Sequence, residues 1–82
     1  MLEMQDEAGA DEKILAVPVD KVFDGYANVR SIEQVSKNWR DRIGHFFTHY
    51  KDLEAGKWVK ITGWGDATRA RTIIEEAVKR FN

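Results

Sequence analysis

Two segments of this sequence carry apolar residues at the spacing of an amphipathic helix, and only one short strand-like segment separates them. The first follows Ser31, where Gln34 three residues later fits a capping box. Its apolar positions are Ile32, Val35, Trp39, Ile43, Phe46, Phe47, Tyr50 and Leu53. The spacing predicts one long helix from Ser31 to residues 55–56, because Gly56 can adopt the left-handed conformation that closes a helix.

The second helical segment lies at the C-terminal end of the sequence. Asp66 is placed to cap it, and its apolar stripe consists of Ala70, Ile73, Ile74, Ala77, Val78 and Phe81. Residues 58–64, between the two helices, are rich in β-branched and aromatic side chains and predict a strand.

The N-terminal part predicts a β-hairpin. Residues 2–5 and 14–19 alternate partially, and Gly9 with two aspartates supplies turn chemistry between them. Residues 20–30 have no clear period and predict a packed loop. The expected fold is therefore α+β, a single domain over residues 1–82 with the order β-β-α-β-α.

A sheet of three short strands cannot close into a barrel, and it leaves edges and an apolar face that need further strands. A chain of this length also buries only about 60–65% of the surface of its unfolded form. The sheet is therefore expected to be incomplete in this chain. We expect a homo-oligomer, because pairing with a second copy is the simplest way to cover that face.

Composition excludes several classes of partner. Thirteen Lys and Arg residues against fourteen Asp and Glu give a net charge of −1, which does not favour binding to nucleic acid or to an anionic membrane. The chain has no cysteine, so disulfides and thiolate zinc sites are excluded and the cytoplasm is the default compartment. The acidic opening has no long apolar run, so neither a signal peptide nor a spanning helix is expected.

Two places in the sequence could carry chemistry. Asp6 and Asp11 flank the glycine turn, with Lys13 on the outgoing strand, and Mg²⁺ binds to one or two carboxylates together with water and phosphate oxygens. Tyr50 and Lys51 lie near the end of the first predicted helix and could bind a phosphate group. The alternatives are that the aspartates are solvated turn formers, that Tyr50 continues the apolar stripe and that Lys51 offsets the helix dipole.

Two other patterns are weaker. His45 and His49 share a helix face, but Phe46 stands where a zinc-protease motif requires Glu, so a metal role is not favoured. The tryptophans at positions 39, 58 and 64 are typical of core or interface residues rather than of a platform for stacking bases.

Taken together, these segments resemble a known family. The runs DEAGADEK (residues 6–13), AVP (16–18), HFFTHYKDLE (45–54) and GKWVK (56–60), followed by Gly63, Trp64 and the final helix, resemble the C-terminal half of bacterial family I inorganic pyrophosphatases. The resemblance implies the later strands and both helices of an OB-like five-stranded barrel. It also implies metal binding by Asp6 and Asp11, and substrate binding by Lys13, Tyr50 and Lys51.

The implied reaction is the Mg²⁺-dependent hydrolysis of diphosphate to two phosphates, by direct attack of metal-activated water. The family's remaining metal-binding carboxylates and its other phosphate-binding residues fall outside the matching segments. We therefore expect the isolated 82-residue chain to have little or no activity. The alternative is a non-catalytic module that associates with itself or docks on a partner; nucleic-acid binding is the least favoured function.

Overall fold

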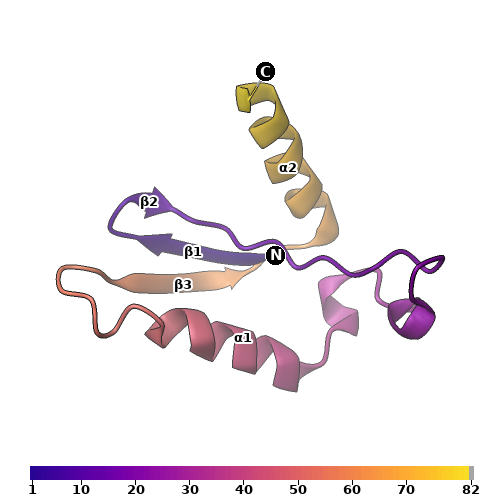
Figure 1. Cartoon of the computed structure of the whole chain (residues 1–82), viewed down its shortest axis with the longest axis horizontal. Helices are drawn as coiled ribbons and strands as arrows, with labels where there is room; N and C mark the ends of the chain where they lie inside the picture. The colour runs from indigo at the N-terminus through magenta and orange to yellow at the C-terminus, as the bar shows by residue number, and fades with distance from the viewer. Residues whose placement is uncertain (82) are drawn as a thin grey trace.

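The computed structural model describes residues 1–81 and shows three antiparallel strands and two α-helices (Figure 1). The elements in chain order are β1 (Leu2–Asp6), β2 (Gly9–Ala10), the 3₁₀ turns η1 (Asp24–Tyr26) and η2 (Ile32–Gln34), α1 (Lys37–His49), β3 (Val59–Trp64) and α2 (Ala67–Phe81). The strand order in the sheet is β2-β1-β3. The predicted α+β class and the order β-β-α-β-α are confirmed.

The small core lies on one face of the central strand β1. Alternate residues of β1 point to one face of the sheet, so Leu2, Met4 and Asp6 lie together on the buried side. Leu2 and Met4 are only 1% and 2% exposed. Helix α1 runs along the neighbouring strand β3 (Figure 1), and Gly44 of the helix faces the Ile61 side chain. The fold therefore depends on very few buried apolar side chains.

The second strand is not where the sequence analysis predicted it. Pairing resumes directly after the turn, with Asp6 opposite Gly9 and Gln5 opposite Ala10. It ends with a bridge between Leu2 and Lys13, so residues 14–19 run past the end of β1 without forming a strand. The prediction of a strand over residues 14–19 was wrong because the tight Gly9 turn sets a register in which those residues have no described strand residue opposite them.

The first helix is also shorter than predicted. The Gln34 side chain accepts a hydrogen bond from the Ser31 backbone N–H, but this caps only the 3₁₀ turn η2. Val35 is then extended, and a new cap forms where the Ser36 hydroxyl accepts from the Trp39 N–H at 3.2 Å. After His49 the chain continues in turns, and Gly56 closes them at a φ of +76°. A second serine cap and these turns divide the predicted helix.

The cap of α2 was predicted correctly: an Asp66 carboxylate oxygen accepts a hydrogen bond from the Arg69 N–H at 2.8 Å. In Figure 1 this helix projects away from the sheet. Its apolar residues Ile74, Val78 and Phe81 are 46%, 55% and 92% exposed. The apolar stripe of α2 is therefore largely uncovered. Neither helix described in residues 1–81 has the length and apolar character needed to cross a bilayer.

The described chain exposes much more surface than a compact protein of its size. Its accessible area is 6360 Å², whereas a folded monomer of 9.5 kDa exposes about 5,000 Å². Its radius of gyration is 14.4 Å, compared with about 12 Å for a compact domain of this length. Residues 1–81 therefore leave much of their apolar surface exposed.

Candidate functional site

The β1–β2 turn places two aspartates on neighbouring strands. Asp6 ends β1, and one of its carboxylate oxygens accepts a hydrogen bond from the Ala8 N–H at 2.9 Å. Gly9, with a φ of +119°, allows the chain to reverse at once. The Asp11 N–H then donates to the Met4 carbonyl at 2.9 Å, which continues the pairing. Because residues opposite each other in an antiparallel pair share a face, Asp11 lies on the same face as Met4 and Asp6.

Lys51 reaches this turn from the far end of α1. Its ammonium nitrogen lies 2.9 Å from Asp6 Oδ2, although the two residues are 45 positions apart in the sequence. Both side chains are mostly covered, with 13% of Lys51 and 10% of Asp6 exposed. This hydrogen bond is the main reason why the pKa of Asp6 is lowered and the pKa of Lys51 is raised. Both groups are therefore charged at neutral pH.

Glu7 supplies a second carboxylate to Lys51. Its Oε1 lies 3.5 Å from the Lys51 ammonium, and its Oε2 accepts a hydrogen bond from the Trp58 backbone N–H at 3.3 Å. The pKa of Glu7 is lowered, first by its own backbone N–H and then by that of Trp58. The sequence analysis did not single out Glu7. The available signals were its acidic side chain next to Asp6 and its place in the run of residues 6–13 that resembles the family.

Lys13 pairs with the other aspartate. Its ammonium lies 3.0 Å from Asp11 Oδ1, and about a third of each side chain is exposed. The same ammonium is 5.5 Å from the ring centre of Phe47 on α1, which is within the range of a cation–π contact. Phe47 was predicted only as part of the apolar stripe of the helix. Its contact with Lys13 joins α1 to the hairpin.

Tyr50 lies beside these ion pairs at the C-terminal end of α1. Its ring stacks on Phe46 at a centroid distance of 5.6 Å and meets Phe47 edge-on at 5.5 Å. The Lys51 ammonium is 5.5 Å from the centre of the Tyr50 ring. Tyr50 remains 41% exposed, so it both continues the aromatic cluster and reaches the surface.

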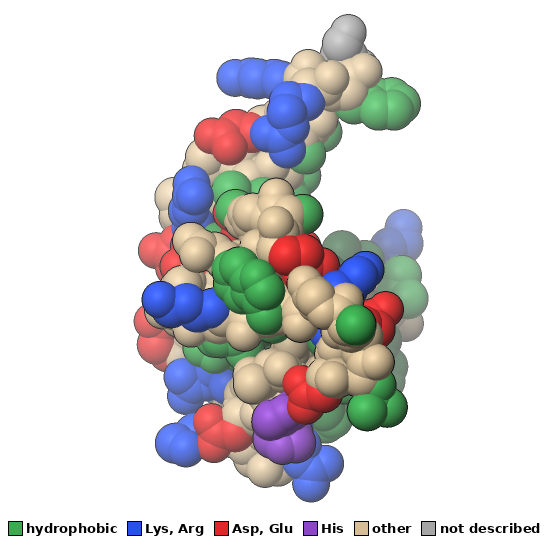
Figure 2. Space-filling model, turned by 90° about the vertical axis from the view of Figure 1, so that its left-hand side faces the viewer, with side chains coloured by type: hydrophobic (Ala, Val, Ile, Leu, Met, Phe, Trp, Pro, Cys, Tyr) green, Lys and Arg blue, Asp and Glu red, His purple; other side chains and the backbone are tan. Residues whose placement is uncertain are grey.

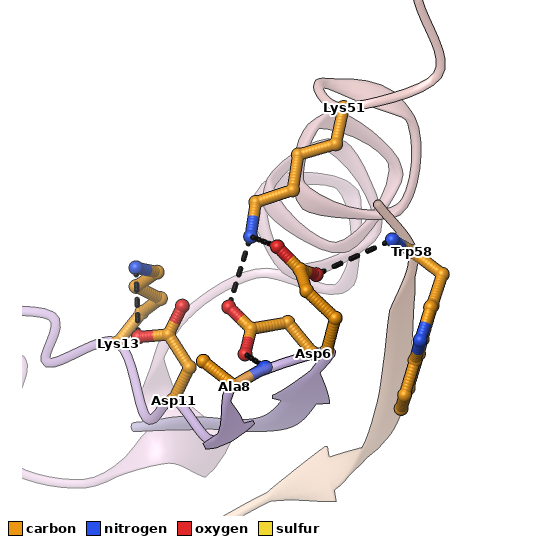
Figure 3. Close-up of polar contacts among 7 residues, drawn as sticks. Asp6, Ala8, Asp11, Lys13, Lys51 and Trp58 are labelled. Carbon is orange, nitrogen blue, oxygen red and sulfur yellow. Dashed lines mark hydrogen bonds and ion pairs between the residues drawn. The ribbon is translucent and has the colours of Figure 1, made fainter. Parts of the chain in front are cut away.

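The side chains of the five candidate metal- and substrate-binding residues thus lie on one face of the hairpin and beside the end of α1, although the Lys13 backbone pairs with Leu2 at the other end of β1. The structure pairs Asp6 with Lys51 and Asp11 with Lys13 (Figure 3). No group of three or more acidic or histidine side chains within residues 1–81 is arranged to hold a metal ion. The carboxylates at this end of the sheet are those of Asp6, Glu7 and Asp11, and Mg²⁺ usually takes one or two carboxylates from a protein.

The other patterns form no comparable site. The rings of His45 and His49 lie 4.6 Å apart, and His49 pairs with Asp52 at 2.8 Å on the exposed side of the helix. Trp39 and Trp58 are 59% and 51% exposed, so they are not core residues of the described chain. Figure 2 shows acidic and basic side chains interspersed on the face at the hairpin end, without a large patch of one sign.

Comparison with known proteins gives a consistent result. The family model described as inorganic pyrophosphatase matches residues 1–82. An inorganic pyrophosphatase of Xanthomonas campestris is 62% identical over the whole chain, and one of Rickettsia prowazekii is 49% identical over 98% of it. In both cases the match covers 46% of the relative, so the chain spans about half the length of the curated relatives it matches.

Solved structures agree with these matches. The chain is similar to an inorganic pyrophosphatase from Helicobacter pylori, with a TM-score of 0.93 and 44% identity, over 98% of this chain and 47% of that one. A structure of the enzyme from Coxiella burnetii gives the same TM-score and identity, over 99% of this chain and 48% of that one. From its sequence and its fold, the chain belongs to the inorganic pyrophosphatase family.

Proposed function

We propose that this chain supplies part of the active site of an inorganic diphosphatase. In this proposal Asp6 and Asp11 bind Mg²⁺, and Lys13, Tyr50 and Lys51 bind the phosphoryl oxygens of diphosphate. The observation that carries it is the ion pair between Asp6 and Lys51, at 2.9 Å. That contact brings together the two separated motifs by which the chain resembles the family.

The chemistry of the residues supports this assignment. Diphosphate carries several negative charges, and the ammonium groups of Lys13 and Lys51 can neutralise charge on its oxygens. The Tyr50 hydroxyl can donate a hydrogen bond to the same ligand. Mg²⁺, when bound to the aspartates, would activate water for direct attack on phosphorus, which releases two phosphates without a covalent enzyme intermediate. Removing Mg²⁺ should therefore abolish turnover.

We further propose that these residues form part of one domain, an OB-like five-stranded barrel whose other strands come from the remaining half of the family fold. Two observations support this: the relatives are about twice as long, and the described chain exposes 6360 Å². An apolar groove of about 560 Å³ lies between α1 and the segment that follows β2. The remaining half of the fold would cover this groove as well. Without that half, we expect the chain to have little activity. We also expect it to associate with a second copy of itself. We place the activity in the cytoplasm, the default for a chain without cysteine.

Mixing experiments test this proposal. The 82-residue chain is combined with a polypeptide that carries the remaining part of the Xanthomonas campestris relative, and phosphate release from diphosphate is followed with and without Mg²⁺. We expect Mg²⁺-dependent release from the mixture and little from either part alone. A stable complex of the two parts that releases no phosphate in Mg²⁺ would contradict the proposed function.

A further inference from the structure

The Lys51 ammonium lies between two carboxylates that have different second contacts (Figure 3). Asp6 approaches it to 2.9 Å, and its other carboxylate oxygen accepts the Ala8 N–H. Glu7 approaches it to 3.5 Å through Oε1, while Oε2 accepts from the Trp58 N–H at 3.3 Å. The Glu7 carboxylate therefore links the lysine to the backbone at the start of β3.

This link matters because a lysine side chain is a flexible four-carbon stem with a compact charge at its end. Lys51 belongs to the turn that follows α1, so its ammonium is placed by the side chains around it. Those side chains leave only 13% of Lys51 exposed. Loss of one partner would give the ammonium more freedom to move away from the hairpin.

The carboxylates of Asp6 and Glu7 also have different roles in the proposed function. Asp6 is assigned to Mg²⁺, and two positive charges that share one carboxylate repel each other. Glu7 is not assigned to the metal in the proposed function, and its second oxygen accepts a hydrogen bond from the Trp58 N–H instead. It can therefore hold Lys51 whether or not Asp6 is engaged elsewhere.

We propose that Glu7 is a positioning residue, which holds the Lys51 ammonium at the hairpin so that it can meet a phosphoryl oxygen of diphosphate. This inference rests on the proposed function, which makes Lys51 a phosphate ligand. Glutamate suits the role because its two oxygens serve Lys51 and the Trp58 N–H separately. Glutamine at this position would keep an acceptor for Trp58 but lose the charge that attracts Lys51.

The test is the Glu7→Gln substitution in the 82-residue chain, with diphosphate binding measured by calorimetric titration in Mg²⁺. We expect binding to weaken roughly five- to tenfold, the size of effect expected from one ion pair or charge-assisted hydrogen bond. The midpoint of thermal unfolding should stay unchanged, because the Trp58 N–H keeps its acceptor. The matched control is Glu75→Gln, which removes the same charge from an exposed position on α2 and should alter neither quantity.

Two results of this titration would overturn the inference. Equal diphosphate affinity in the wild type and Glu7→Gln overturns the inference. Weaker binding together with a lower unfolding midpoint also overturns it, because Glu7 would then be a structural residue.

Absence of binding by the wild-type chain alone leaves the proposed function to the mixing experiment, and hydrogen exchange of the Lys51 ammonium, followed by NMR, then decides on Glu7. Faster exchange in Glu7→Gln supports the holding contact, and unchanged exchange overturns it.

Discussion

Replacing Asp11 by Asn is expected to reduce Mg²⁺-dependent phosphate release roughly a hundredfold or more in an enzyme that contains this segment. The suitable enzyme is a chimera in which these 82 residues replace the matching part of the Xanthomonas campestris relative, since the two align over the whole chain. Asparagine keeps the size of the side chain but removes the charge that would bind the cation. The loss of rate should therefore occur without loss of folding, as judged by circular dichroism.

The matched control for this substitution is Asp41→Asn. Asp41 pairs with Lys37 at 2.6 Å on the exposed side of α1, and more than half of each side chain is accessible. The same chemical change there should leave the rate within about twofold, because surface ion pairs contribute little. If Asp11→Asn and Asp41→Asn have equal rates, Asp11 is not a metal ligand.

The largest expected effect on stability comes from Leu2. This side chain is 1% exposed and is one of the three buried apolar residues, with Met1 and Met4, in the described chain. Leu2→Ala should lower the free energy of unfolding by about 2–5 kcal/mol, which is a large share of the stability of a small domain. Denaturant unfolding of the chain, followed by circular dichroism, measures the loss.

Leu53→Ala is the control for that measurement. Leu53 is 101% exposed in the turn after α1, so the same truncation there should change the free energy of unfolding by less than about 0.5 kcal/mol. Similar losses for the two variants would mean that the buried face of β1 does not form the core.

Much of the fold could be predicted because its signals are local. The glycine turn, the strand before Trp64 and the Asp66 cap each depend on residues within a few positions of one another. The division of the first helix could have been foreseen from Ser36, which offers a second cap inside the apolar stripe. The missing strand over residues 14–19 could not, because the register of the hairpin decides which residues remain paired.

The sequence could single out candidate site residues but not the contacts that those residues make. Asp6 and Asp11 follow from the turn, and the sequence placed Lys51 at the end of a helix without showing what it meets. The contact between Lys51 and Asp6 spans 45 positions and depends on how α1 packs along β3. Glu7 was missed for the same reason. Its proposed role depends on a hydrogen bond from the Trp58 N–H, and Trp58 is 51 positions away in the sequence.

The exposed apolar surface of α2 and of the groove beside α1 fits the account that this segment works together with the remaining half of the family fold. Ile74, Val78 and Phe81 lie on one stripe of α2, where a partner could cover them together.

The most direct test of the central claim is the rate of phosphate release by the chimera itself, because the covalent link removes any dependence on assembly of two parts. We expect release from diphosphate that requires Mg²⁺ and stops when a chelator is added. A folded chimera that releases no phosphate in Mg²⁺, while the Xanthomonas campestris relative does so under the same conditions, would contradict the account.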